Sequence, residues 1–295
     1  MISNEKTQKS LIHLQQRTVL MFRSLFIYEF EKFWFKKINI VCLIAILIVN
    51  LLSLKFALQS NKTADMTDIV FNSSLNFHIT SLQEMLLTAF NAIVITFCIL
   101  SFHEEYRKGY LRMTFMRGIS IRKLYIAKSL VMSLNILLTI IIHLIISLLI
   151  ALIVLPKTST SPLYFKEGLY GISDVVFFSI KYYFLAYFSL LTFGSIIEFL
   201  SIKSRSIAGV LGLSLGFVFL NFIYISYVSF LFKNYPVSDP LVLKYNSLSF
   251  VFVQAKGVAY FASGITDVFL YSLIFMYLIF KSLSYLAFTN KNYLE

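Results

Sequence analysis

Six long apolar runs, separated by short polar segments, constrain this chain more than any other feature of its sequence. A bilayer core about 30 Å thick is crossed by roughly 20 helical residues, so each run is long enough to span a membrane. A membrane β-barrel would instead show strands of about ten residues with alternating polarity, whereas these runs are continuous. We therefore predict an all-α, polytopic membrane protein with six transmembrane helices, at about residues 38–57, 82–102, 130–155, 175–199, 207–232 and 265–287.

Composition supports a bilayer as the solvent of this chain. Of its 295 residues, 58% are hydrophobic and only 14% are charged, which leaves too little polar surface for a water-soluble domain. The longest segments outside the runs are 1–37, 103–129 and 233–264, each too short for a separate soluble domain. We predict a cytoplasmic N-terminus over 1–37, a transmembrane domain over 38–287 and a cytoplasmic tail over 288–295.

The distribution of Lys and Arg predicts the orientation. If the six runs cross in alternation, the N-terminus, residues 103–129, residues 200–206 and the C-terminus share one side. That side holds 18 of the 26 Lys and Arg residues, counting Lys281 near the end of the last run. Basic flanks stay in the cytoplasm, so both termini are expected there. The same topology explains the net charge of +12, so membrane lipid is an expected partner and nucleic acid is not.

Two segments outside the spans have helical character. An apolar stripe recurs every three or four residues through Val19, Phe22, Phe26, Phe30 and Phe33, with polar residues opposite. This pattern predicts an amphipathic helix lying in the plane of the membrane, the alternative being a cytoplasmic extension of the first span. The second segment, 247–262, is too polar for a seventh span and too apolar for a free loop, so a short helix in or dipping into the outer leaflet is expected.

Ionisable side chains in or beside the runs are candidates for function, because they are costly inside a membrane. His143 and Lys181 are predicted to line a translocation path or to pair neighbouring helices. Four others lie at the ends of runs and are expected to reach water as border residues: Lys55, Glu84, Glu198 and Asp267.

The Gly-x-Ser-x-Gly pattern around Ser214, with His143 in another run, is also found at the nucleophile of serine proteases, so a membrane serine protease is an alternative. Such catalysis needs the Ser and the His within hydrogen-bond reach and an oxyanion hole. Gly209, Gly212 and Gly216 also form a small-residue face that lets two helices approach closely. We interpret the pattern as a helix-packing face.

The segment between the second and third runs is the most specific part of the sequence. Between His103 and Lys128 it holds seven basic and two acidic residues. Large apolar residues are mixed with these charges, as on a protein-docking surface, the alternative being a solvated basic loop: Tyr110, Leu111, Met113, Phe115 and Met116.

This segment resembles the type-2 ABC-transporter permease family. Members carry an acidic residue after the second span, then a Gly-x-Leu-Arg-like turn, a Gly- or Pro-Ile-Ser-Arg-like turn and a Lys that opens the third span. Ile121 departs from the pattern, since many relatives have a basic residue there and Arg122 follows one place later. The six spans, the N-terminal helix and the long loop before the last span match the family layout. The motif positions are Glu104 or Glu105, Gly109, Leu111, Arg112, Gly118, Ile119, Ser120, Arg122 and Lys128.

The resemblance implies that the segment forms a coupling helix against a separate ATP-binding subunit. The chain has no Gly-x-x-x-x-Gly-Lys-Ser/Thr run, so it is expected to be no enzyme itself, and ATP and Mg²⁺ are expected on the partner. No metal or cofactor is expected in this chain. The residues implied in ATPase coupling are Glu104, Glu105, Arg107, Gly109, Leu111, Arg112, Met116, Arg117, Gly118, Ser120 and Arg122.

The function implied by the resemblance is that of a permease, most simply an exporter of a hydrophobic or amphipathic substrate such as an antimicrobial peptide. A second permease chain, identical or homologous, would complete the transporter. The chain itself is expected to be a multi-pass protein of a bacterial plasma membrane. Two alternatives stay open at this point: a non-transporting anchor or sensor subunit, and a secondary carrier.

Overall fold

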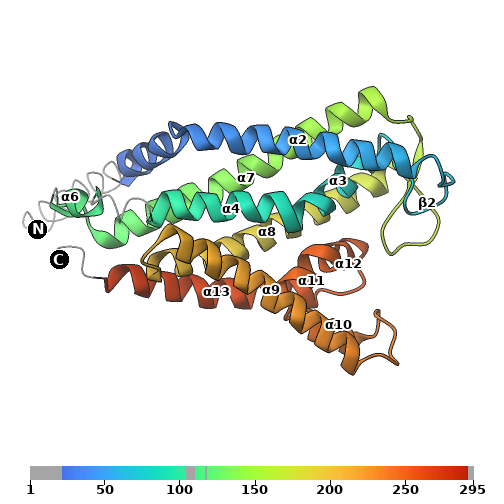
Figure 1. Ribbon diagram of the computed structural model, residues 1–295. Helices are drawn as coiled ribbons and strands as arrows, with labels where there is room; N and C mark the ends of the chain where they lie inside the picture. Colours follow the sequence, from blue (N-terminus) through green and yellow to red (C-terminus); the bar gives the residue numbers. More distant parts are fainter. Residues whose placement is uncertain (1–21, 104–109, 117, 292–295) are drawn as a thin grey trace, which may run out of the picture.

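The computed structural model describes residues 22–103, 110–116 and 118–291, and it is almost entirely helical (Figure 1). Six of the described helical stretches are long and apolar enough to cross a membrane, which confirms the predicted number of spans. They are α2 (Lys37–Ser60), a composite span over Phe77–His103, α7 (Ile121–Val154), α8 (Ile172–Lys203), α9 (Ile207–Leu231) and α13 (Val268–Thr289).

The second span contains two turns of π-helix. Its α-helical parts alternate with turns of π-helix, which are rare and occur frequently at functional sites. A π turn shifts the register of the helix, so residues on either side of it face different neighbours than a regular helix would give them. In order, the span consists of α3 (Phe77–Met85), η1 (Leu86–Phe90), α4 (Asn91–Cys98) and η2 (Ile99–His103).

Two spans begin earlier than the hydropathy pattern suggests. α3 begins at Phe77 rather than near residue 82, and α7 begins at Ile121 rather than near residue 130. The first turns of α7 carry Arg122 and Lys123, which lower the hydropathy of this part without stopping the helix. With 34 residues, α7 is about 51 Å long, so it exceeds the thickness of a bilayer core.

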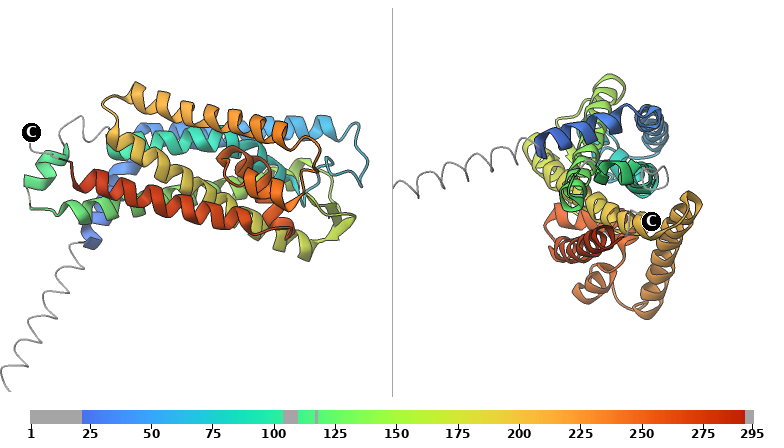
Figure 2. Two further views of the ribbon diagram at one scale, coloured as in Figure 1. Left: turned by 90° about the horizontal axis from the view of Figure 1, so that it is seen from below. Right: turned by 90° about the vertical axis from the view of Figure 1, so that its left-hand side faces the viewer.

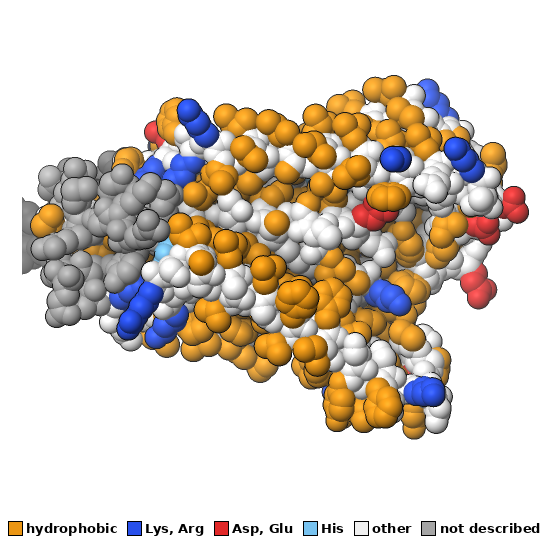
Figure 3. Space-filling view, viewed as in Figure 1, with side chains coloured by type: hydrophobic (Ala, Val, Ile, Leu, Met, Phe, Trp, Pro, Cys, Tyr) orange, Lys and Arg blue, Asp and Glu red, His pale blue; other side chains and the backbone are white. Residues whose placement is uncertain are grey.

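The two ends of the bundle differ in what they carry. The helical residues 22–34, α6 (Tyr110–Met116) and the end of α13 lie at one end (Figures 1 and 2). At the other end lie the short antiparallel strands β1 (Thr160–Pro162) and β2 (Leu169–Gly171). On the visible face, most of the Asp and Glu side chains that are drawn in colour lie toward the end opposite α6 (Figure 3).

Helix α8 is the centre of the bundle. Within its most apolar window 72% of the residues are buried, and it packs against α13, α4, α12 and α7. α9 and α13 are peripheral, with 17% of the corresponding window buried in each. Their outward faces are therefore left to lipid or to another chain.

The N-terminal helical residues 22–34 pack against the bundle. Leu25, Glu29 and Phe33 recur every four residues and are buried, and the Phe33 ring meets Phe97 edge-to-face at 4.9 Å. The amphipathic pattern is thus realised in a packed helix. Val19 lies outside the described residues, and an orientation in the membrane plane stays a prediction. Beside this buried row lie four half-buried aromatic residues that also pack against the core: Phe22, Phe26, Phe30 and Trp34.

The chain between α9 and α13 folds into short helices that enter the bundle, and we call residues 240–263 the short-helix segment. Phe250 and Val258 in this segment are fully buried, and the Phe250 N–H donates to Asn221 Oδ1 at 2.7 Å. The expected short helix is present, broken by a π turn and packed on α8 and η1. Its parts are α10 (Pro240–Asn246), α11 (Phe250–Phe252), η3 (Val253–Gly257) and α12 (Val258–Ser263).

Candidate functional site

Helix α6 lies in the segment that the motif marks for coupling, and it projects from the end of the bundle (Figure 2). Leu111 is 2% exposed and anchors one side of α6 on the bundle, whereas Met116 is 67% exposed. α6 therefore combines a fixed face with an open one. The remaining coupling residues of this segment lie outside the described residues or have side chains that do: Glu104, Glu105, Arg107, Gly109, Arg112 and Arg117.

A tight turn joins α6 to α7. Gly118 has a φ of +78°, in the left-handed region that favours glycine, and its N–H donates to the Phe115 carbonyl at 2.9 Å. The Ser120 carbonyl then accepts from the Leu124 N–H at 3.0 Å, which opens α7. Only four residues separate the two helices.

Beyond this turn, α7 enters the bundle beside a buried ion pair. Lys128 Nζ lies 2.6 Å from Glu29 Oε2, and the two residues are 2% and 6% exposed. Buried charges are tolerated in a protein when they are paired. This contact ties α7 to the N-terminal helical residues 22–34.

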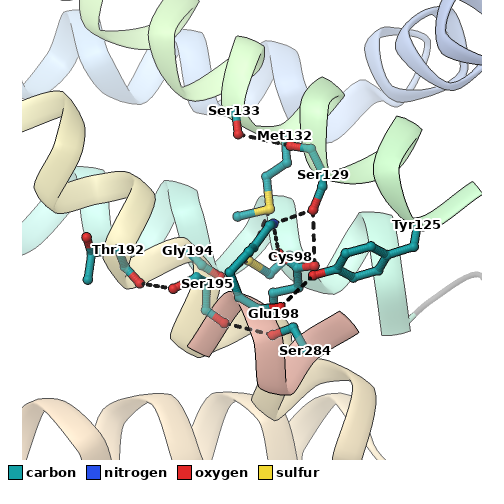
Figure 4. Close-up of polar contacts among 11 residues, drawn as sticks. Cys98, Tyr125, Ser129, Met132, Ser133, Thr192, Gly194, Ser195, Glu198 and Ser284 are labelled. Atoms are coloured by element: carbon teal, nitrogen blue, oxygen red, sulfur yellow. Dashed lines mark hydrogen bonds and ion pairs between the residues drawn. The ribbon is translucent and has the colours of Figure 1, made fainter. Parts of the chain in front are cut away.

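A second ion pair, between Glu198 and Lys281, lies beside Ser129 of α7, and Figure 4 shows Tyr125, Ser129 and Glu198 close together. Glu198 Oε2 on α8 lies 2.7 Å from Lys281 Nζ on α13, and Ser129 on α7 donates to Glu198 Oε1 at 3.3 Å. Ser129 Oγ also contacts Lys281 Nζ, and the Tyr125 hydroxyl donates to the Lys281 carbonyl at 3.3 Å. Three spans meet at this cluster.

The position of Glu198 corrects a sequence-based expectation. A border residue reaching water was expected, but Glu198 is 0% exposed. α8 continues past it to Lys203, and α7 and α13 cover this turn, so the carboxylate is enclosed and neutralised by Lys281 instead of water.

His143 belongs to a polar network in the half of the bundle away from α6. It is fully buried, with Nε2 3.3 Å from Ser81 Oγ and Nδ1 3.2 Å from the Tyr183 hydroxyl. Ser81 donates in turn to Asn50 Oδ1 at 2.9 Å, and Tyr183 donates to the His78 carbonyl at 3.1 Å. The network joins α2, α3, α7 and α8.

Lys181, the other candidate for a translocation path, has different surroundings. It is half-buried on α8, with Nζ 4.6 Å from the centre of the Phe177 ring. His143 contacts Ser81 on α3 and Tyr183 on α8, and these contacts support a helix-pairing role for it. The ring contact of Lys181 shares no residue with them. A translocation role for either residue stays a prediction.

The glycine face of α9 remains open. No side chain or neighbouring helix of the described chain lies within 4 Å of where a Cβ would stand at Gly212 or Gly216, whereas a Cβ at Gly209 would meet Ser204 Oγ. Ser214 is buried and donates to the Val210 carbonyl of its own helix at 2.6 Å. The Gly-x-Ser-x-Gly pattern therefore lies within a regular helix, and its serine is not brought to His143.

Several residues of these clusters were not singled out from the sequence, although Lys281 stands out as a charge inside an apolar run. Its partner could not be read from the sequence, because the pair joins positions 83 residues apart. Glu29 was not singled out, because the amphipathic pattern was read from its apolar positions only. Among the described residues, no group of three or more metal-ligating side chains comes together.

No model of a known protein family matches the chain, and no characterised protein matches it either.

Proposed function

We propose that this chain is the membrane-spanning permease subunit of a type-2 ABC transporter, coupled to a separate ATPase through α6. The observation that carries the proposal is the position of α6 between the second and third spans. It protrudes from the bundle at the end that also carries residues 22–34, with Leu111 buried and Met116 exposed. A docking helix needs this combination of anchorage and accessible apolar surface.

The connection of α6 to the spans favours the same function. A force applied to α6 reaches α7 through a four-residue turn. The base of α7 is tied to residues 22–34 by Glu29–Lys128 and to α8 and α13 by Glu198–Lys281 and Ser129. Several helices can therefore move together when α6 is displaced, as ATP-driven rocking of a permease requires.

The remaining parts of the proposal follow from charge and exposure. The α6 end is the cytoplasmic one, because the basic flanks lie there. The sparsely buried α9 and α13 leave surface for a second permease chain. ATP and Mg²⁺ act on the partner subunit, and the cargo is hydrophobic or amphipathic and is exported across a bacterial plasma membrane.

Association with an ABC ATPase encoded in the same genome tests the proposal. Met116→Asp places a charge on the exposed face of α6, and we expect the affinity for the ATPase to fall about tenfold or more, as for an interface hot spot. Met66→Asp is the matched control, since Met66 is 63% exposed at the opposite end of the bundle. Equal co-purification of both variants with the ATPase would contradict the proposal.

A charge-reversal pair gives an independent test. Arg112→Glu combined with Arg117→Glu reverses the basic charge of the coupling segment, and association should be lost. Lys157→Glu, at an exposed position of the opposite end, should leave it unchanged. Transport that survives ATP depletion and collapses with the proton gradient would favour a secondary carrier, and partner binding without transport would favour an anchor or sensor subunit.

A further inference from the structure

A cavity of about 510 Å³ opens in the half of the bundle away from α6. It lies between α2, α3, η1 and the short-helix segment, with Tyr164 and residues near Asn72 closing one side. Its volume is in the range of sites for drug-sized ligands. The walls combine apolar surface from Phe56, Ala57 and Leu87 with several polar groups.

Glu84 provides the one carboxylate among the described residues that line this cavity. α3 begins seven residues earlier, so Glu84 lies about 10 Å along this helix, and its place at the membrane border stays a prediction. It is exposed, and no described residue forms an ion pair with it. Ionisable residues within spans face water-filled cavities or partners and are functional candidates by default.

Two residues that line the same cavity each carry a buried oxygen atom that is available as an acceptor. Ser53 is 3% exposed and lines the cavity, and its Oγ has no hydrogen-bond partner in the described chain. Gln83 Oε1 is likewise buried without a described partner, while Gln83 Nε2 donates to the Ala255 carbonyl at 3.1 Å. A carboxylate and unused acceptors fit a ligand that brings donors and a positive charge.

The wall of the cavity is held in place by contacts that do not need a ligand. Asn91 and Gln254 exchange two amide hydrogen bonds, of 2.7 and 3.0 Å, between the second span and η3. Together with the contact from Gln83 to Ala255, this pair joins the two sides of η1, in α3 and α4, to the π-helical segment η3. The site is therefore preformed, which limits the ordering cost of binding.

Tyr164 is the other ionisable side chain among the described residues that line the cavity. Burial raises the pKa of the Tyr164 hydroxyl well above its ordinary value, and the Glu84 carboxylate raises it further. The phenol therefore stays neutral, and no negative charge from it competes for a bound cation.

We propose that this cavity is a binding site for a drug-sized organic cation. The cationic nitrogen lies at Glu84, with Ser53 and Gln83 accepting from its N–H groups, and the apolar body lies against Phe56 and Leu87. Binding does not depend on an ATPase, so this proposal goes beyond the proposed function and can fail without it.

Fluorescence anisotropy of rhodamine 6G, a fluorescent organic cation that carries N–H groups, tests the site. The full chain is studied in phosphatidylcholine nanodiscs, with empty nanodiscs subtracted and fluorescein as an anion of similar size. Saturable binding of rhodamine 6G, with at least about tenfold weaker binding of fluorescein, is expected. Glu84→Gln should weaken rhodamine 6G binding about tenfold or more. Glu167→Gln, an exposed carboxylate at the same end that does not line the cavity, should leave it unchanged.

A gain-of-affinity variant guards against loss of folding as the explanation. Thr88 is exposed and lines the cavity one turn after Glu84, so Thr88→Glu should tighten binding about fivefold at pH 8. Absent binding to the unmodified chain, equal affinity after Glu84→Gln, or no gain from Thr88→Glu would each overturn the proposal. The ATPase-association test would stand in every case.

Discussion

Replacement of Lys281 by Met tests whether the buried ion pair holds the base of α7 in place. Glu198 is 0% exposed and its Oε2 lies 2.7 Å from Lys281 Nζ, so the variant leaves a carboxylate buried without its counterion. Breaking a buried pair by removing one partner costs about 3–5 kcal/mol. The Lys281 side chain is 23% exposed, so water reaches the site in part and we expect a loss of about 2–3 kcal/mol in the free energy of unfolding.

The double variant distinguishes an ion pair from general packing damage. When Lys281→Met is combined with Glu198→Leu, no charge remains buried, and most of the lost stability should return. Unfolding in mixed dodecyl maltoside and SDS micelles, followed by circular dichroism, measures all four members of the cycle. Lys181→Met, a lysine lying over an aromatic ring, should cost about 1 kcal/mol or less. A double variant as unstable as the sum of its single variants would refute the reasoning.

Three further predictions concern the connections of α6 and of the cavity wall. Glu29→Gln should cost about 1.5–3 kcal/mol of unfolding free energy in the same assay, because it removes a charged hydrogen bond to the buried Lys128 ammonium. Gly118→Ala should cost about 1–2 kcal/mol, because of the left-handed backbone, and should also weaken ATPase association. Asn91→Ala should speed hydrogen exchange in residues 250–257, because it breaks the reciprocal amide contact with Gln254.

Each of these three variants is compared with a control substitution at another position of the same chain. Glu31→Gln changes an exposed carboxylate of the N-terminal helix and should alter stability by less than about 0.5 kcal/mol. Gly168→Ala introduces the same backbone strain at the opposite end, so it should lower stability without weakening ATPase association. Thr96→Ala removes a hydrogen bond internal to its own helix and should leave exchange in 250–257 unchanged. The opposite result for any control would contradict the corresponding assignment.

The spans could be predicted because their signal is local. A run of about 20 apolar residues identifies a spanning helix without knowledge of its neighbours. Boundaries were less accurate where polar residues lie within the helix, as at Arg122 and Lys123. The short helix α6 was expected from motif resemblance, and its buried Leu111 and exposed Met116 became visible only with the fold.

The polar clusters could not be predicted, because they depend on contacts between distant positions. Glu198 reads as a border residue in sequence, and only the extension of α8 together with the approach of α13 makes it buried. That Glu84 lines a cavity could likewise be seen only with the fold. A single sequence also gives no indication that Asn91 and Gln254 meet across 163 residues.

Helix α7 connects the two regions that these proposals assign to ATPase coupling and to ligand binding. At one end it follows α6 and carries Lys128 and Ser129 into the buried ion clusters. About two-thirds of the way along, its His143 contacts Ser81, which lines the cavity that contains Glu84. A movement of α7 driven from α6 would therefore also move Ser81 in the cavity wall. His143 is fully buried, and its close-packed surroundings leave its side chain no room to change conformation independently. Such coupling must be reciprocal, so rhodamine 6G bound at Glu84 should change the affinity of the ATPase for α6 in the intact complex.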